Sequence, residues 1–329
     1  MSRNFACRLS GEVASPSGAA AAALRARAAQ WEMPILETAD RLVWSLWGGE
    51  LRLIPERDSL RIELHGPERR QIGLLQDMVS EALAEAGLGV AWDHVDVGAL
   101  APGLAVMRVA SVRRLSPGFL RIRLSGPEAG RFGQGGLHFR LLLPPPGRVP
   151  VWPRIGPTGR TIWPEAADAL HRPVYTVAAQ QGDWLDFDIY RHPGSPTCDW
   201  AMSGIEGSDV AIMGPGGGWL PEAPQILLFG DQTALPAIRR IMQLQPLCAP
   251  ESRILGAWLR VDSADLVGLA SDPRITAVPD LLGALRAAPL PEAAHVWFAG
   301  HADDARQARD ELTARGLGRK SVTAAAYWS

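Results

Sequence analysis

Hydrophobic and polar residues alternate in two short segments near the start of the chain, ELRLI at 50–54 and SLRIELHG at 59–66. Alternation with a period of two is typical of strands that bury one face. The next segment has helical spacing instead, with apolar positions at Ile72, Leu75, Val79 and Leu83. Gly87 predicts where this helix ends, and AAAALRARAAQW at 20–31 has helix-forming composition. These patterns predict a small α+β domain.

The middle of the chain contains further short strand-like segments. In WLDFDIYRH, the alternation places Leu185, Phe187 and Ile189 on one face, and Asp186, Asp188 and Tyr190 on the other. GFLRIRLSG at 118–126, HFRLLLP at 138–144 and PVYTVAA at 173–179 predict three more strands. Residues 144–165 are so rich in Pro and Gly that they predict a long surface loop. Several short strands separated by turns favour a small β-barrel.

From about residue 222 the pattern changes, because strand-like and helical segments now alternate. The strand-like segments are QILLFG, RILGAWLRV, HVWFAG and SVTAAAYW, and the helical ones are PAIRRIMQL, PDLLGALRAA and DDARQARDELTARG. This alternation favours a doubly wound parallel sheet. A barrel followed by such a sheet is the domain order of two-domain flavin reductases, which is an analogy at the level of the fold only.

Composition and charge narrow the classes of function. A net charge of −2 over 329 residues, without a basic stripe, argues against a nucleic-acid partner. No apolar run is long enough to span a bilayer, so we expect no membrane insertion. Cys7, Cys198 and Cys248 lie far apart, and the seven histidines form no ligand cluster. We therefore expect no metal site and a cytoplasmic protein, with residues 1–18 as a flexible tail.

The segment ILLFGDQTALPAIRRI, residues 226–241, predicts an abrupt corner between a strand and a helix. Gly230 allows a sharp turn, Thr233 is placed to cap the helix, and Pro236 falls in the first turn, where its missing N–H is harmless. In an open parallel sheet, ligands bind beyond the carboxyl ends of the strands. Backbone N–H groups at such a corner favour an anion such as a pyrophosphate.

Several motifs in one order give the corner a context. They are HRPVYTV, DFDIYRHPGSPTCDWA, MGPGGGW, GDQTALPAI, WFAGHAD and the terminal AAYW. Together, over residues 106–328, they resemble the siderophore-interacting protein family of FAD-dependent ferric-siderophore reductases, distant relatives of the ferredoxin–NADP reductases. The resemblance implies domains at 19–103 (a small α+β accessory domain of unknown function), 104–221 (a Greek-key-type β-barrel that binds FAD) and 222–329 (an α/β domain with a doubly wound parallel sheet that binds NAD(P)H).

The resemblance also implies roles for individual residues. Those implied to bind FAD are Arg172, Tyr175, Thr176, His192, Pro196, Thr197, Cys198, Trp200, Tyr327 and Trp328. Those implied to bind NAD(P)H are Gly230, Asp231, Thr233, Ala234, Leu235 and Pro236. Candidates near the substrate are Arg140, Arg191, Arg260 and His301. The sequence departs from the family pattern at Pro173, Ala178, Cys198, Gln232 and His301.

The implied reaction passes a hydride from NAD(P)H to FAD and then single electrons to a ferric chelate, which releases ferrous iron. No side chain acts as acid or base, because the flavin carries the chemistry. Two alternatives remain open at this point. One is a degenerate member without firm FAD binding that acts as a siderophore-binding or regulatory protein, and the other is a general flavin reductase. Some members take electrons from ferredoxin, and the sequence is compatible with that donor as well.

Overall fold

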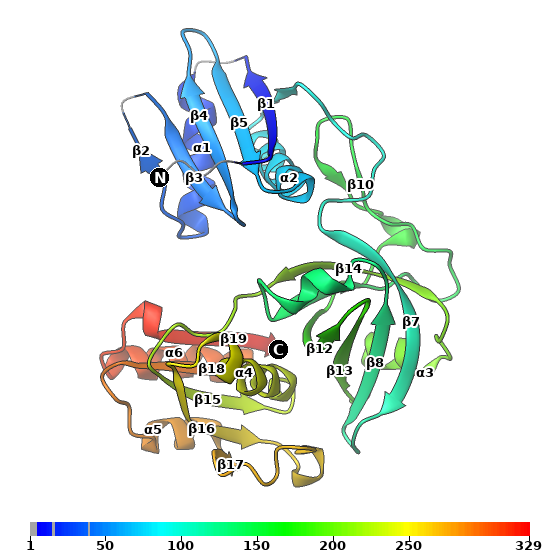
Figure 1. Ribbon diagram of the computed structural model, residues 1–329, viewed down its shortest axis with the longest axis vertical. Coiled ribbons are helices and arrows are strands. Elements are labelled where there is room, and N and C mark those ends of the chain that lie inside the picture. Colours follow the sequence, from blue (N-terminus) through cyan, green and yellow to red (C-terminus); the bar gives the residue numbers. More distant parts are fainter. Residues whose placement is uncertain (1–4, 15–16, 39) are drawn as a thin grey trace. The chain divides into compact units, whose positions relative to one another are not determined.

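The computed structural model describes residues 5–14, 17–38 and 40–329, which form two compact units. The first unit comprises Met1–Leu104 together with Arg148–Leu170, and the second comprises Ala105–Gly147 together with His171–Ser329 (Figure 1). No helix in the described ranges combines the length and the apolar character needed to cross a membrane.

The first unit contains a six-stranded sheet with the order β2-β3-β4-β5-β1-β6. Its strands are β1 Cys7–Val13, β2 Leu36–Glu37, β3 Leu42–Leu46, β4 Gly49–Pro55, β5 Leu60–Gly66 and β6 Ala91–Trp92. The expected flexible tail at 1–18 is therefore wrong for β1, which pairs antiparallel with β5 along its whole length. Each residue of β1 pairs with a residue of β5 that lies 47 to 59 positions later in the chain, so no local sequence pattern could predict this pairing. Residues 1–4 and 15–16 of the expected tail lie outside the described residues.

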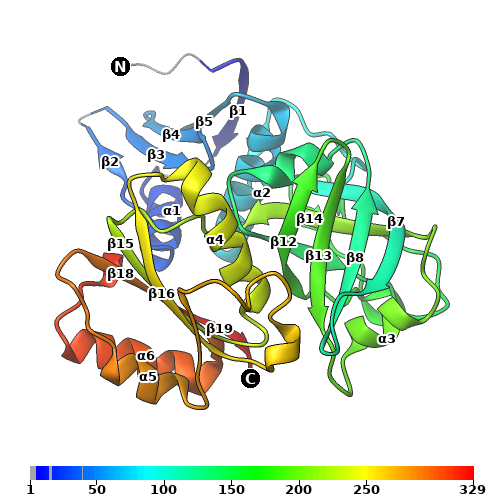
Figure 2. The same cartoon turned by 60° about the horizontal axis from the view of Figure 1, so that its bottom comes forward.

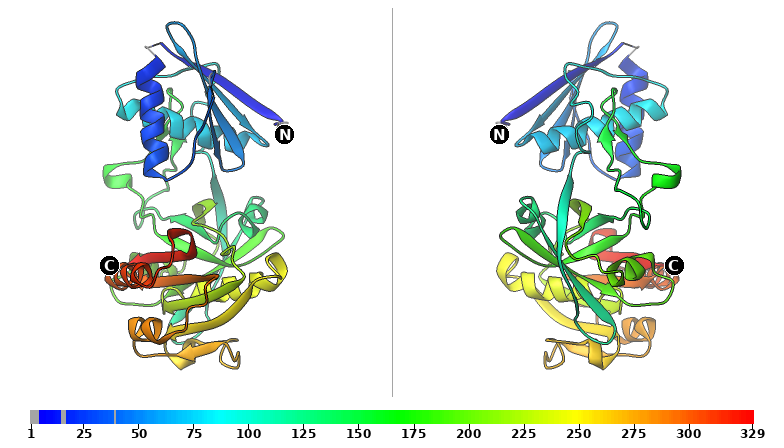
Figure 3. Two further views of the ribbon diagram at one scale, coloured as in Figure 1. Left: turned by 90° about the vertical axis from the view of Figure 1, so that its left-hand side faces the viewer. Right: turned by 90° about the vertical axis from the view of Figure 1, so that its right-hand side faces the viewer.

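Two helices, α1 Ser17–Gln30 and α2 Arg69–Glu85, pack on one face of this sheet (Figure 3). The alternation in β4 and β5 turns Leu51, Leu53, Ile62 and Leu64 toward the helices, where they are buried. Helix α2 ends as predicted, because Gly87 follows it with a φ of +72°. The predicted α+β character of this region is confirmed.

The Pro- and Gly-rich segment 144–165 is more ordered than a surface loop. It contains a two-stranded hairpin of β10 Arg154–Ile155 and β11 Thr161–Ile162. The Ile155 N–H donates to the Ala99 carbonyl, and the Thr161 N–H donates to Asp77 of α2. The stretch from Arg148 to Leu170 consequently belongs to the first unit, whereas the expected bounds 104–221 include it in the barrel domain. The pairing partners, not the local composition, decide where it folds.

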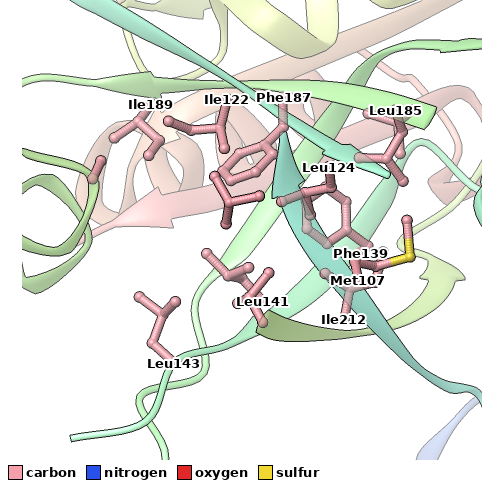
Figure 4. Packing of buried hydrophobic residues seen from close by; sticks show 14 of the residues in the cluster. Met107, Ile122, Leu124, Phe139, Leu141, Leu143, Leu185, Phe187, Ile189 and Ile212 are labelled. Carbon is pink, nitrogen blue, oxygen red and sulfur yellow. The ribbon is translucent and has the colours of Figure 1, made fainter. Parts of the chain in front are cut away.

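The second unit begins with a closed antiparallel barrel in the order β12-β13-β8-β7-β14-β9. The strands are β7 Leu104–Arg114, β8 Phe119–Ser125, β9 His138–Leu142, β12 Val174–Gln181, β13 Trp184–Tyr190 and β14 Asp209–Gly216, and helix α3 is Pro196–Met202. The four strands expected from alternation are present. Inward-facing side chains such as Ile122, Phe139 and Phe187 pack against one another in the interior (Figure 4). The barrel interior is thus a packed hydrophobic core.

The chain then forms a five-stranded parallel sheet in the order β17-β16-β15-β18-β19. Its elements are β15 Gln225–Asp231, α4 Leu235–Cys248, β16 Arg253–Arg260, β17 Ile275–Ala277, α5 Leu281–Ala287, β18 Ala294–His301, α6 Ala302–Ala314 and β19 Val322–Trp328. Helix α4 covers one face, and α5 and α6 cover the other (Figure 2). The predicted doubly wound sheet is confirmed. Numbered along the chain, its strands follow the 3-2-1-4-5 order of dinucleotide-binding sheets.

Buried charged groups join the barrel to the parallel sheet. Asp188 of β13 accepts two hydrogen bonds from Arg121 of β8, at 2.6 and 2.8 Å, and a third from Arg239 of α4 at 3.3 Å. A second link is the Gly118 N–H, which donates to Asp265 at 2.8 Å. Because Asp188, Arg239 and Asp265 are buried, these contacts fix the position of helix α4 against the barrel.

Candidate functional site

The corner between β15 and α4 is held by Asp231, whose side chain is fully buried. Its Oδ1 accepts from the Thr233 backbone N–H at 2.9 Å and from the Thr233 hydroxyl at 2.6 Å. The predicted capping role of Thr233 is therefore wrong. The helix begins at Leu235 after Ala234, which makes no side-chain cap, and Asp231 organises the turn instead. Pro236 lies in the first turn, as predicted.

Gly230 is required at this corner by close packing. A Cβ on Gly230 would lie 2.7 Å from Cβ of Ala234 and 2.7 Å from Cδ1 of Ile238. The strand and the helix therefore approach each other more closely than any side chain allows.

The last strand brings two aromatic residues to the same edge of the sheet. The indole N–H of Trp328 donates to Oδ2 of Asp231 at 2.7 Å, although 44% of this residue remains exposed. The imidazole of His301 meets the Trp328 ring edge to face, with centroids 4.6 Å apart. Arg260 lies 3.8 Å from the same Asp231 oxygen and binds Asp304 at 3.1 Å. Asp231 thus holds both the corner and the aromatic end of β19.

A buried histidine connects this strand to the barrel. Nδ1 of His138 lies 3.1 Å from the Thr176 hydroxyl, and Nε2 lies 3.1 Å from the Tyr327 hydroxyl. Burial lowers the pKa of His138 to about 4, so the ring is neutral at physiological pH. A neutral imidazole has one donor and one acceptor, so one hydroxyl donates to it and the other accepts. The line Thr176–His138–Tyr327 therefore fixes Tyr327 against the barrel.

These elements surround a cavity of about 460 Å³. Its volume lies within the range of small-molecule pockets. Of the residues implied by the resemblance, those that line it are Tyr175, Thr176, His192, Thr233, Pro236, Tyr327 and Trp328. The cavity therefore brings together residues expected on the FAD side and residues expected on the NAD(P)H side. Gly230, Asp231, Ala234 and Leu235 lie behind it as the buried support of the corner.

Tyr175 is a suitable wall for a flat ligand. Its ring packs against Phe187 of the barrel core at a centroid distance of 5.2 Å. Burial raises the pKa of its hydroxyl to about 12, so Tyr175 stays protonated. On the opposite side of the strand, Ala178 sits in a bulge between Val177 and Ala179, where the register to β13 shifts. This position of β12 therefore holds a small buried residue.

The residues around α3 form a group of their own and do not line the cavity. Ser195 caps α3 by accepting from the Cys198 N–H at 3.3 Å, and the Cys198 thiol donates to the Tyr190 carbonyl. The Thr197 hydroxyl lies 3.4 Å from Nε2 of His171. Pro196 begins the helix, and Trp200 packs against the barrel core. Cys198 is thus a buried structural thiol.

The basic candidates are scattered. Arg172 is exposed just before β12, and its carbonyl accepts from the Arg140 side chain at 3.1 Å. Arg191 donates to the Pro117 carbonyl. Neither Arg140, Arg172 nor Arg191 lines the cavity. In the described part of the chain, no group of three or more His, Cys, Asp and Glu side chains could hold a metal ion.

The sequence reasoning missed three contributors to the site, His138, Asp188 and Tyr190. His138 carried one usable signal, because it is a polar residue at the start of an apolar strand and lies two positions after the pair Gly135–Gly136. The alternation in β13 predicts Asp188 and Tyr190 on the face opposite to Phe187, and only the approach of α4 makes that face part of a cavity wall.

Family models match nearly all of the second unit. Residues 108–219 match the siderophore-interacting FAD-binding domain, and residues 223–329 match the siderophore-interacting protein domain. Residues 1–107 precede both matches.

Named relatives agree with the family models. The chain is 28% identical over 241 residues to a ferric vibriobactin reductase of Vibrio cholerae serotype O1, which covers 65% of this chain and 85% of the relative. It is 26% identical over 238 residues to an NADPH-dependent ferric-chelate reductase of Escherichia coli K12, covering 68% and 91%. Among solved structures, a siderophore utilization protein from T. fusca has 26% identity and a TM-score of 0.55, covering 71% of this chain and 95% of the other.

Proposed function

Because this chain belongs to the siderophore-interacting protein family, we propose that it is a flavin-dependent ferric-siderophore reductase. The observation that carries the proposal is the cavity beside Tyr175, which opens where the barrel rim meets the carboxyl edge of the parallel sheet. This is the edge at which α/β sheets bind nucleotides. The names of the two curated relatives, a ferric vibriobactin reductase and a ferric-chelate reductase, support the same reaction class.

The residues present fit a flavin. Tyr175 supplies a flat apolar wall, and Thr176, His138 and Tyr327 supply a neutral hydrogen-bonded edge. His192 is exposed at the rim and stacks on Tyr190 with centroids 6.1 Å apart. We assign the pyrophosphate to the start of α3 and to Arg172, as the family resemblance implies.

The co-substrate NAD(P)H is assigned to the corner of β15 and α4. Asp231 holds the turn so that the cavity is lined by Thr233 and Pro236, and it also anchors Trp328. The three relatives named above give no support for ferredoxin as a donor, so the proposed donor is NAD(P)H.

When bound, FAD supplies the conversion of a two-electron hydride donor into one-electron steps, each of which reduces one ferric ion to a ferrous ion. The protein's own part is to bind, to orient and to exclude water. The imidazole of His138 is neutral and the hydroxyl of Tyr175 stays protonated, so neither side chain brings a charge to the cavity wall. Hard oxygen donors hold ferrous iron weakly, so reduction releases it.

The test combines an absorbance spectrum with an iron-release assay. Purified protein should be yellow or should become so with added FAD, and NAD(P)H should then release ferrous iron from at least one member of a ferric-siderophore panel, detected with a ferrous chelator. Tyr175→Ala should weaken FAD binding about tenfold or more, because it removes an aromatic wall. Trp184→Ala is the matched control, since Trp184 lies in the barrel beneath Arg123 and outside the cavity.

Each alternative has its own outcome. A colourless protein that ignores added FAD would point to a siderophore-binding or regulatory role instead. Flavin reduction without ferrous release from any ferric siderophore would point to a general flavin reductase. Wild-type FAD affinity in Tyr175→Ala would contradict the assignment of the cavity.

A further inference from the structure

A second cavity, of about 310 Å³, also includes a residue of the β15–α4 corner in its wall. It is lined by Gln232 from the corner and by Arg260, Asp262 and Asp265 from the carboxyl end of β16 and the turn after it. Tyr190 lines both cavities. The two cavities therefore flank one corner, as the nicotinamide and adenosine halves of a dinucleotide would require.

The strand order identifies what this second cavity would hold. β15 is the first strand of the sheet and β16 is the second, and β15 lies between β16 and β18. In sheets of this order the pyrophosphate lies over the end of the first strand. An acidic residue after the second strand binds the 2′-hydroxyl of the adenosine ribose, whereas an arginine there accommodates a 2′-phosphate. This chain has both types of residue, Arg260 and Asp262, so geometry must decide between them.

Arg260 lines this second cavity, but its guanidinium is already paired with two carboxylates. Its guanidinium binds Asp304 at 3.1 Å, in the first turn of α6, and lies 3.8 Å from Asp231 at the end of β15. Since α6 follows β18, the side chain extends from β16 across the end of β15. Two carboxylates already balance its charge. Arg260 therefore lies over the pyrophosphate position and offers little to a 2′-phosphate.

Asp262 remains on the ribose side. Its Oδ1 accepts from the Ala264 N–H at 2.9 Å, which sets the short 3-10 helix Ser263–Asp265 and leaves Oδ2 for a ligand hydroxyl. Asp265 adds a second negative charge to the wall. Among the lining residues, all of which belong to the described part of the chain, Arg260 is the only cation. A phosphate monoester with a charge near −2 would thus face carboxylates without an uncommitted cation.

We propose that the co-substrate is NADH rather than NADPH, and that Asp262 makes this choice by binding the ribose 2′-hydroxyl. The inference rests on the proposed hydride-accepting function, and it differs from the name of the Escherichia coli relative, which is called NADPH-dependent. The physical basis is that a carboxylate accepts hydrogen bonds from a diol and repels a phosphate at the same position.

Two measurements test this inference independently. The first uses the FAD-loaded full chain and compares the rate constants for flavin reduction by NADH and by NADPH in stopped flow. The second needs no flavin and compares the affinities of 5′-AMP and adenosine 2′,5′-bisphosphate by calorimetry. NADH and 5′-AMP should be favoured by about 10- to 100-fold, the usual effect of one charge-assisted hydrogen bond replaced by like-charge repulsion.

Asp262→Asn is the informative variant, because the amide oxygen can still accept from Ala264 while the charge is lost. It should bring both ratios to within about threefold of one. Asp272→Asn is the control, since Asp272 also accepts a backbone N–H two residues on, from Arg274, but lies outside the cavity. It should leave both ratios unchanged.

A wild-type preference for NADPH or for adenosine 2′,5′-bisphosphate would overturn the proposal, and so would equal use of both. A preference for NADH that survives Asp262→Asn would overturn the role of Asp262. If neither coenzyme reduces the flavin, the proposed function fails, while the calorimetric ratio still decides whether this cavity selects a ribose without a 2′-phosphate.

Discussion

The buried charges around Asp188 allow a quantitative test of what joins the barrel to the parallel sheet. The Asp188 side chain is fully buried, and its partners Arg121 and Arg239 retain only 17% and 9% side-chain exposure. Asp188→Ala would leave two buried cations without their carboxylate. Breaking a buried ion pair in this way costs about 3–5 kcal/mol.

The neighbouring pair provides a matched control. Asp186 lies two residues earlier on β13 and binds Arg123 in the same bidentate manner, at 2.8 and 2.9 Å. Arg123, however, has 39% side-chain exposure and lies over Trp184, so it can regain water when Asp186 is removed. Asp186→Ala should therefore cost about 1–2 kcal/mol. Both substitutions delete the same atoms, so the difference between their losses of stability measures the cost of leaving buried arginines without a carboxylate.

The assay is thermal unfolding of the full chain, followed by circular dichroism. At about 2–4 °C per kcal/mol for a unit of this size, Asp188→Ala should lower the melting temperature by about 6–20 °C and Asp186→Ala by about 2–8 °C. Adding Arg239→Met to Asp188→Ala removes one stranded charge and should recover about 1–3 kcal/mol. Equal losses for the two aspartates, or a double variant less stable than Asp188→Ala alone, would refute the reasoning.

Two further predictions concern the walls of the main cavity. Burial lowers the pKa of His138 from 6.5 to about 4 in the folded protein, so the unfolded chain binds more protons between these values and stability falls as the pH drops from about 6.5 to 4. His138→Gln should therefore make the fall in melting temperature between pH 7 and pH 5 smaller. An unchanged fall would contradict the burial of a neutral ring. Gly230→Ala should destabilise the protein by about 1–3 kcal/mol in urea unfolding, because its Cβ would lie 2.7 Å from Ala234 and Ile238. Gly318→Ala, whose Cβ would have open space, should be nearly neutral, and similar effects of the two would argue against the close approach at the corner.

Local pattern determined most of the secondary structure of this protein. The period-two segments became β4, β5, β8 and β13, and the alternation after residue 222 became a parallel sheet with helices on both faces. These features follow from the spacing of the apolar side chains that become buried, and a segment of a few residues is enough to show whether that spacing fits a strand or a helix. The motifs that carried the family resemblance likewise lie in contiguous stretches.

Only the tertiary structure decided the strand pairings and ion pairs whose partners lie far apart in the chain. β1 is ordered by β5, and the segment Arg148–Leu170 folds with the first unit because its pairing partners are there. Asp188 lies on the polar face of its strand, yet it is buried because Arg121 and Arg239 neutralise it from two other elements. Buried charges and paired strands depend on groups that no short window of sequence contains, so these contacts, and with them the cavity walls, appear only when the chain is folded.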